Sequence, residues 1–420
     1  MWFYVDRILV SYQVADAAAH QRPRGNLSDL YPRWLGAREL LLHGRNPYSD
    51  DITIEIEKGY YGRALDEARP DDPKDRQGFA YPVYVVFVLA PLIGLPFHEV
   101  QIFFHWLLLV VTAGSVWLWL KALRWRLPPL AIAAAMALTL GSVPGVQGIK
   151  LQQLSLLVAA LLAGSAACVA SGYLFCGGAL LAVATIKPQL AWLFVAWLLL
   201  WAISDWRARR RLVFGFGLVM ALLLGGAEIV LPGWLRMFTA ALGQYHRYTR
   251  NQSVLDQLVP WGFAGKILAL AAVVGCAFFL WKVRRQPGDA ADFGEATALV
   301  MALTVLVVPM YAPYNQVLLV PAILVLVRDR EMFLSRIRRF AYLVGVLVVG
   351  WEWAASLSLS AIYLVGTRAW AMERWKWPFL ATFALPVWVF ALIFFCVNKS
   401  GTAPSGRVVI RESELTSDPA

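Results

Sequence analysis

Charged side chains are scarce in this chain. Asp, Glu, Lys and Arg together make up 15 % of its 420 residues, whereas hydrophobic residues make up 59 %. Soluble globular proteins carry charged residues at roughly a quarter of their positions, so the composition excludes an ordinary soluble globule. Repeated apolar runs of about 15 to 23 residues instead predict an all-α polytopic membrane protein.

Cysteines are few, and the common signatures of soluble enzymes are missing. The chain has neither a P-loop nor a Gly-rich dinucleotide turn, and HEVQIFFH places Ile102 where the second histidine of a zincin motif would fall. We therefore expect no metal and no cofactor. Four cysteines lie in apolar runs, with neither metal-ligand spacing nor a disulfide framework: Cys168, Cys176, Cys276 and Cys396.

The formal net charge of +11 calls for an explanation. Nucleic-acid binding would require a basic patch interleaved with stacking aromatic residues, and the sequence has none. The excess Lys and Arg lie instead in short segments between apolar runs, as the positive-inside rule expects of cytoplasmic loops. We therefore predict membrane lipids, and no nucleic acid, as partners.

About eleven apolar segments are candidates for membrane-spanning helices. Several are short for a hydrocarbon core about 30 Å thick, which indicates tilted helices or burial inside a bundle. We interpret residues 1–12, which are too short to span, as the remnant of a first spanning helix. The candidate spans are 100–121, 129–145, 153–170, 172–187, 189–203, 211–231, 263–282, 295–311, 313–327, 340–362 and 377–397.

The basic clusters predict one membrane topology. They follow the spans that end at residues 121, 203, 282 and 327, and two or four spans separate successive clusters. A single alternating topology therefore places every cluster in the cytoplasm, together with a polar, disordered tail at 398–420. Residues 1–397 then form one membrane domain, in which 26–98 is the first extracytoplasmic loop and 100–397 is the helix bundle.

Residues 79–97, FAYPVYVVFVLAPLIGLPF, are apolar enough to be a further span. As a span they would move the basic cluster after residue 121 to the outer side. We therefore interpret them as a juxtamembrane or re-entrant helix broken by Pro91 and Pro96, and a true span is the alternative.

Cationic side chains collect on the predicted outer side, against the usual bias. Lys187 lies where a proline breaks an apolar run, and it is either a snorkelling anchor or a cation for a lipid phosphate. His246, Arg247 and Arg250 form a second cluster in the loop 232–262, which is either a solvated loop face or a phosphate site.

The stretch NLSDLYPRWLGARELLLHGRNPYS, residues 26–49, predicts an amphipathic helix with Asp29 at its head. An Asp or Ser directly before such a helix is usually its N-cap. Ser28 is the alternative cap and would leave Asp29 free to act as a base. We expect Gly44 to end the helix. Capping and catalysis by Asp29 both stay open.

The order of these motifs resembles glycosyltransferase family 87, whose members are polytopic enzymes of the GT-C fold. The likeness covers about residues 28 to 327 and rests on GARELLLHGRNPYS, the segment 79–97, IKPQLAWL and VPMYAPYNQVLLVPAILVLV. It implies a GT-C-like bundle of about 11 to 12 spanning helices.

The resemblance further implies transfer of a hexose, with mannose favoured, from a polyprenyl-phosphate-sugar donor to a lipid or glycan acceptor. The reaction would occur on the extracytoplasmic face of a bacterial inner membrane, with Asp29 as the base and inversion at the anomeric carbon. The expected ligands of the donor phosphate are Lys187, His246, Arg247 and Arg250. The expected substrate contacts are Tyr81, Gln189, Asn251, Gln252, Tyr314 and Asn315.

Two other classes of membrane protein explain part of the sequence. A transporter or flippase would use midplane ion pairs and interrupted helices in repeated halves, and neither is visible. A scaffolding protein would explain the hydropathy but not the outer cations. We therefore favour the transferase, with a multi-pass transporter as the alternative.

Overall fold

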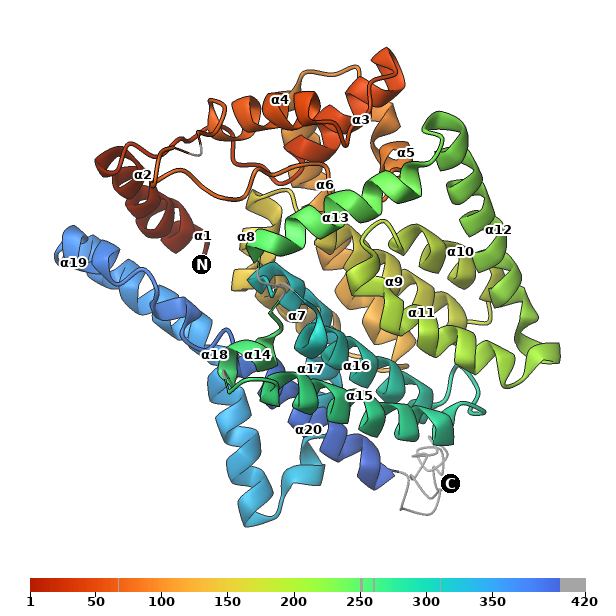
Figure 1. Ribbon diagram of the computed structural model, residues 1–420. Coiled ribbons are helices and arrows are strands. Elements are labelled where there is room, and N and C mark those ends of the chain that lie inside the picture. The colour runs from red at the N-terminus through yellow and green to blue at the C-terminus, as the bar shows by residue number, and fades with distance from the viewer. Residues whose placement is uncertain (67, 250–251, 260, 310, 401–420) are drawn as a thin grey trace, which may run out of the picture.

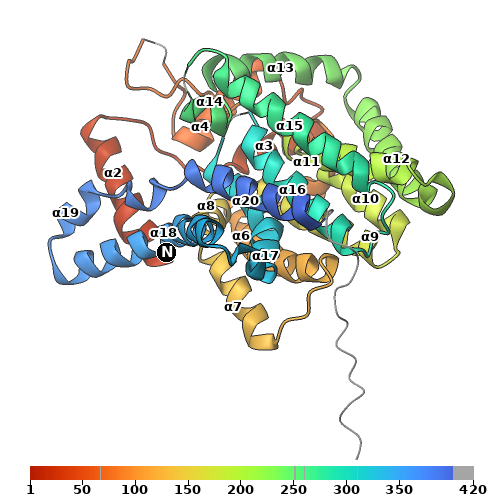
Figure 2. The same ribbon diagram turned by 90° about the horizontal axis from the view of Figure 1, so that it is seen from below.

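Every element of secondary structure in the described part of the chain is a helix. The computed structural model describes residues 1–66, 68–249, 252–259, 261–309 and 311–400. Its helices gather around a common core, with the N-terminal helices at one edge (Figures 1 and 2). The predicted all-α polytopic class is therefore confirmed.

The first half of the chain forms a helical first loop followed by the early helices of the bundle. Its elements are α1 (Trp2–Tyr4), the π-helix η1 (Val5–Leu9), α2 (Val10–Ala19), α3 (Tyr31–His43), α4 (Asp50–Tyr61), α5 (Val85–Leu89), the 3-10 helix η2 (Ala90–Leu92), α6 (Phe97–Ala122), α7 (Pro129–Leu140), α8 (Val143–Lys150), α9 (Leu154–Ala170), α10 (Leu174–Ala184), α11 (Pro188–Ile203) and α12 (Trp206–Val230).

The second half of the chain completes the bundle. Its elements are α13 (Trp234–Thr249), α14 (Val254–Leu258), α15 (Ala264–Val283), α16 (Ala291–Val307), the 3-10 helix η3 (Pro313–Leu319), α17 (Val320–Arg328), the 3-10 helix η4 (Arg330–Phe333), α18 (Arg336–Val365), α19 (Arg368–Glu373), the 3-10 helix η5 (Trp377–Phe379) and α20 (Ala384–Ser400). Because α20 extends to Ser400, the first residues of the predicted tail 398–420 are helical. Residues 401–420 lie outside the described residues.

Five helical stretches of the described chain are long and apolar enough to cross a membrane. The pair α7 and α8, bent by 60°, would make a sixth. The other predicted spans correspond largely to shorter helices, namely α9, α10, α11, α16 and the stretch from η3 to α17. The five long stretches are Phe97–Ala122, Trp206–Val230, Ala264–Val283, Arg336–Val365 and Arg368–Val397.

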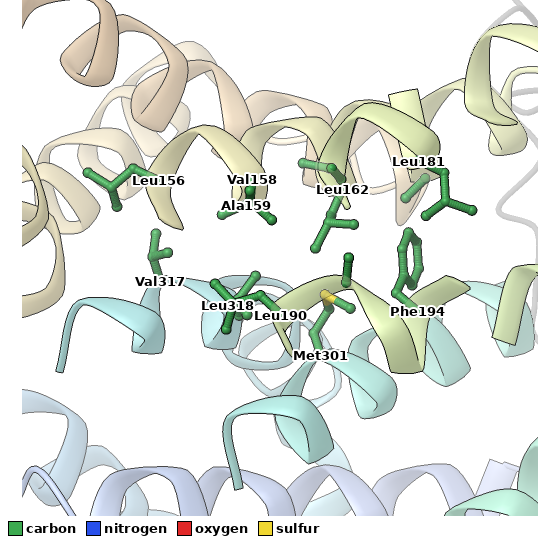
Figure 3. Close-up of a cluster of buried hydrophobic side chains, with 14 of the residues drawn as sticks. Leu156, Val158, Ala159, Leu162, Leu181, Leu190, Phe194, Met301, Val317 and Leu318 are labelled. Carbon is green, nitrogen blue, oxygen red and sulfur yellow. The ribbon is translucent and has the colours of Figure 1, made fainter. Parts of the chain in front are cut away.

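The short helices form the centre of the bundle. Leucine, valine and alanine side chains along one face of α9 meet side chains from α11, α16 and η3, as Figure 3 shows. Helix α16 is the most enclosed, since it is buried from Phe293 to Leu306. A helix surrounded by protein can be shorter than the bilayer is thick, because its neighbours and not lipid cover its ends.

Two glycines let α10 and α12 pack closely together. A Cβ atom at Gly178 would collide with the main-chain oxygen of Leu212, and one at Gly215 would collide with that of Phe175. Lipid tails are as apolar as leucine, so the hydrophobic effect does not drive helices together inside a membrane. Close packing does so instead, and small residues are therefore frequent at helix contacts. This contact fixes α12, whose far end leads into α13.

The N-terminal helix packs against the C-terminal part of the chain. Tyr4 and Ile8 are fully buried in a cluster with Leu359 of α18 and Ala371 of α19. Figures 1 and 2 both show α2 beside α19. The segment predicted as a short remnant, 1–12, is helical and continues as a helix to Ala19.

The ambiguous segment 79–97 forms only short helices. Helix α5 has five residues and η2 has three, with Pro91 inside η2 and Pro96 as the N-cap of α6. Neither helix is long enough to cross a bilayer, because a span needs about 20 residues.

Candidate functional site

The head of α3 shows what Asp29 and Ser28 do. The helix begins at Tyr31, and its N-cap residue, Leu30, makes no side-chain cap. Ser28 Oγ accepts a hydrogen bond from the Leu30 N–H at 3.3 Å and donates one to Gln152 Oε1 at 2.6 Å. The capping interpretation of Asp29 is therefore wrong, and Ser28 stabilises the turn before the helix.

The carboxylate of Asp29 is free of the helix, and Asp29 lines a cavity of about 380 Å³. It accepts hydrogen bonds from Gln153 Nε2 and, at 3.1 Å, from the Tyr60 hydroxyl. Gly44 ends α3 in the left-handed conformation, with φ of 65°, as the sequence predicts. Six residues predicted for the site line this cavity: Asp29, Tyr81, Lys187, Gln189, Tyr314 and Asn315.

A chain of hydrogen bonds joins the carboxylate to a buried cation. Gln153 donates through Nε2 to Asp29 and accepts through Oε1 from Lys187 Nζ at 3.1 Å. Lys187 Nζ also donates to Ser155 Oγ at 2.6 Å, and Ser155 Oγ donates to Asn315 Oδ1 at 2.9 Å. The amide of Gln153 thus separates the two charges, so that Asp29 and Lys187 do not neutralise each other in an ion pair.

Lys187 is buried at the cavity wall, which excludes the snorkelling interpretation. Its side chain is only 6 % exposed, whereas a snorkelling lysine extends its ammonium group to the water interface. The ammonium nitrogen lies 5.1 Å from the ring centroid of Tyr314 and 6.0 Å from that of Tyr81. A lysine ammonium has three donors, and the described residues supply oxygen acceptors for two of them. The third donor is available to a ligand.

The backbone around the cavity is strained. Leu27, Gln77 and Gln152 have φ values of 50°, 56° and 50°, in the left-handed region that residues with a Cβ atom rarely adopt. Leu27 is two residues before Asp29, Gln152 directly precedes Gln153, and Gln77 itself lines the cavity. Such strain is concentrated at functional sites, where the surrounding structure holds side chains in a required direction.

Burial sets the basicity of Asp29. It raises the pKa of the Asp29 carboxyl above the ordinary value of 3.8, and it is the largest effect on this group. The charge of Arg33, the hydrogen bonds from Gln153 and Tyr60, and the charge of Lys187 lower the pKa in part. A carboxylate with a raised pKa is a stronger base than a solvated one.

Several cavity residues were missed by sequence reasoning. Gln153 lies in a polar motif, KLQQ, that gave no sign of a link to Asp29, which is 124 residues away. Arg33 lies in the first turn of α3, and its Nη1 donates to the main-chain oxygen of Asp29, which precedes the helix. Asp75 and Gln77 lie in a loop without a periodic pattern, and no signal in the sequence singles them out.

The segment predicted as the loop 232–262 contains a helix. Phe238, Leu242 and Tyr245, spaced by four and three residues, form one face of α13 and line the cavity. Figure 1 shows α13 running across the bundle from the end of α12. The helix therefore covers the cavity with its apolar face, as expected of an amphipathic helix.

The remaining predicted site residues are Gln252 and four residues of the cationic segment before it. Gln252 does not line the cavity, and its main-chain oxygen accepts from the Tyr311 N–H at 3.3 Å. Gln252 is also exposed, so the described structure gives its predicted sugar contact no support. The side chains of His246 and Arg247, and the residues Arg250 and Asn251, lie outside the described residues.

Metal-ligating side chains do not cluster in the part of the chain that the structure describes. No group of three or more His, Cys, Asp or Glu residues there is arranged to hold a metal ion. The two carboxylates of the cavity, Asp29 and Asp75, are accompanied by the cations Arg33 and Lys187. The cavity is therefore suited to an organic ligand that carries both hydroxyl and anionic groups.

Comparison with known proteins defines the class of the chain, which is a glycosyltransferase with membrane-spanning helices. It belongs to glycosyltransferase family 87, whose model matches residues 79–309. No curated protein and no solved structure matches it. The matched range contains Tyr81, Gln153 and Lys187, whereas Asp29 precedes it and Tyr314 follows it. The cavity thus joins the matched range to segments on both sides.

Proposed function

We propose that this enzyme transfers a hexose, with mannose favoured, from a polyprenyl-phosphate-sugar to a lipid or glycan acceptor. The single observation that carries the proposal is the hydrogen-bonded chain from Asp29 through Gln153 to Lys187. It brings a carboxylate and a buried cation to one cavity, and a displacement at an anomeric carbon needs a base and a cation.

In the proposed reaction the acceptor oxygen attacks the anomeric carbon of the donor while its proton passes to Asp29. The bond between that carbon and the phosphate oxygen breaks, and its electron pair stays on the phosphate. Lys187 supplies a buried positive charge for the phosphate, whose charge grows during this step. Attack opposite the leaving group inverts the anomeric centre. The other predicted residues of the cavity would contact the sugar and the phosphate: Tyr81, Gln189, Tyr314 and Asn315.

We propose the extracytoplasmic face of a bacterial inner membrane as the location of the reaction. Helix α11 begins at the cavity, with Lys187 as its N-cap, and ends 16 residues later next to the basic segment around Arg209. At 1.5 Å per residue its length is about 24 Å, close to the thickness of the bilayer core. The cavity and the basic segment therefore lie at opposite ends of the bundle, and the positive-inside rule assigns the basic end to the cytoplasm.

The donor class can be tested with the purified chain in liposomes that contain a bacterial lipid extract as acceptor. We expect radiolabelled mannose to pass from polyprenyl-phosphate-mannose into a lipid or glycan product. The same label supplied as a nucleotide sugar, without a lipid carrier, should stay unused. Transfer from the nucleotide sugar, or solute uptake without any transfer, would overturn the proposal.

A further inference from the structure

Arg33 is a buried arginine at the cavity wall with unused hydrogen-bonding capacity. Its side chain is 8 % exposed, and Nη1 donates to the main-chain oxygen of Asp29 at 2.8 Å. The guanidinium carbon lies 4.4 Å from the ring centroid of Tyr81. Nε is buried and has no hydrogen-bond partner within the described residues.

The charge of Arg33 also lacks a direct partner. Asp29 and Asp75 line the same cavity, yet neither carboxylate forms an ion pair with Arg33 in the described part of the chain. Asp75 is instead held by Gln77, which donates to it from the main-chain N–H at 2.9 Å and from Nε2 at 2.8 Å. A guanidinium stays protonated in proteins, and burying one without a partner is costly. The part of the cavity that Arg33 lines is therefore suited to an anion that comes from outside the chain.

A second arginine on the same helix is a natural comparison. Arg38 Nη1 donates to the main-chain oxygen of Ile93 at 2.8 Å, and its guanidinium lies 5.6 Å from the ring of Trp34. It thus makes the same two kinds of contact as Arg33, but it does not line the cavity. The difference between the two residues is that Arg33 lines the cavity and is buried with its Nε unpartnered among the described residues, whereas Arg38 is only partly buried and lies off the cavity.

We propose that Arg33 binds a phosphate ester in the cavity, together with Lys187. The inference rests on the proposed function and adds a second phosphate ligand to it. Both cations lie near the ring of Tyr81, at 4.4 Å for the Arg33 carbon and 6.0 Å for the Lys187 nitrogen. Each retains a donor without an oxygen acceptor in the described chain. A guanidinium offers parallel N–H groups that match two oxygens of a phosphate, and an ammonium adds a point charge.

This ligation has a consequence for the proposed reaction. The donor is a phosphodiester with one negative charge, and the released polyprenyl phosphate is a monoester with up to two. The electron pair of the broken bond stays on the phosphate, and the proton of the acceptor goes to Asp29. The positive charges of Arg33 and Lys187 stabilise the added negative charge. The released polyprenyl phosphate should therefore bind more tightly than the donor.

The phosphate has two possible sources, the donor and a phospholipid acceptor. The test uses the full chain in nanodiscs of phosphatidylcholine and two probes, farnesyl phosphate for the donor and phosphatidylglycerol for a phospholipid acceptor. Farnesol is the uncharged control. We expect Arg33→Gln to weaken binding of one phosphate probe about tenfold, and Arg38→Gln to leave it unchanged. Farnesol binding should not differ among the variants.

The outcomes separate the two sources. Weaker farnesyl phosphate binding assigns Arg33 to the donor phosphate, and weaker phosphatidylglycerol binding assigns it to the acceptor. Equal affinities of Arg33→Gln and Arg38→Gln for both probes would overturn the proposal. If Arg33→Gln does not fold, Arg33→Lys takes its place. It should bind one probe less tightly than the wild type, because lysine lacks the parallel N–H groups of the guanidinium. Wild-type affinity of Arg33→Lys for both probes would overturn the proposal. The binding measurement does not require sugar transfer. The two probes therefore test Arg33 even if the proposed transfer reaction is not observed.

Discussion

Two equally buried arginines lie at opposite ends of the bundle and have different surroundings. Arg209 is 6 % exposed and Arg33 is 8 % exposed. Arg33 donates to one main-chain oxygen and leaves its Nε unpartnered within the described residues. The guanidinium of Arg209 donates at 2.8 to 2.9 Å to the main-chain oxygens of Trp201, Arg284, Arg285 and Gln286.

The contacts of Arg209 follow from helix geometry. The last carbonyl groups of a helix have no partner inside that helix, and Arg209 meets such groups at the ends of both α11 and α15. At this basic end a buried cation completes the structure. At the cavity end Arg33 and Lys187 keep donors that have no acceptor among the described residues. The comparison shows that burial of a charged side chain does not by itself indicate function. The two arginines differ in how many of their N–H groups have an acceptor within the chain.

Replacing Asp29 should have the largest effect at the cavity end. Asparagine keeps the shape and can still bond to Gln153 and Tyr60, but it accepts no proton. We expect Asp29→Asn to lower the rate of sugar transfer by about a thousandfold or more without loss of folded protein. The measurement is transfer in proteoliposomes. Asp51→Asn, at an exposed position in the same loop, is the control and should keep full activity.

Removing the charge of Lys187 should have the next largest effect. Glutamine preserves polar contacts with Gln153 and Ser155, so the variant should fold. We expect kcat to fall about a hundredfold, because a preorganised charge is lost where the phosphate gains charge. Lys58→Gln, at an exposed position of α4, serves as the control. A change in KM alone would show that Lys187 binds the ground state and transition state equally.

At the basic end, Arg209→Gln should affect stability and not catalysis. Several buried carbonyl oxygens would lose their donor, at a cost of about 3 kcal/mol in the free energy of unfolding. The melting temperature of the detergent-solubilised protein should fall, while activity per folded molecule stays at the wild-type level. Lower activity per folded molecule would contradict the contrast between the two ends.

The pH dependence should connect Asp29 to Arg33. The base must be deprotonated, so kcat/KM rises with pH through the pKa of Asp29, which burial holds above 3.8. The positive charge of Arg33 lowers this pKa, and Arg33→Gln removes that effect. The acidic limb of the profile should therefore move to higher pH in Arg33→Gln and stay in place in Arg38→Gln. A shift in the opposite direction would show that Arg33 does not act on Asp29.

The sequence predicted the class, most helices and the family because these depend on local pattern. Apolar runs mark helices inside a membrane, and Gly44 ends α3 as its conformational freedom predicts. The prediction of helix lengths was less complete. Among the described residues, fewer helices are long enough to span a membrane on their own than the sequence predicted. The buried short helices depend on neighbours that hydropathy along the chain does not show.

The candidate site could be predicted only in part. Lys187 stood out because it lies where a proline breaks an apolar run, and Asp29 because it lies at the head of a helix and matches the family pattern. Their connection through Gln153 requires segments more than a hundred residues apart to meet, and no periodicity encodes such an approach. The unpartnered Nε of Arg33 is likewise a property of three-dimensional packing. Gln252 was selected as a polar side chain near the cationic cluster, and it is exposed and does not line the cavity.

The configuration of the product tests the central claim most directly. That claim is that Asp29 acts as the base opposite the leaving phosphate, and that a buried cation of the same cavity binds this phosphate. Purified enzyme would be given polyprenyl-phosphate-mannose of known anomeric configuration, and the linkage in the product would be determined by NMR. The account predicts the opposite configuration at the transferred sugar. Retention of the donor configuration, or no transfer from this donor by folded enzyme given a suitable acceptor, would contradict it.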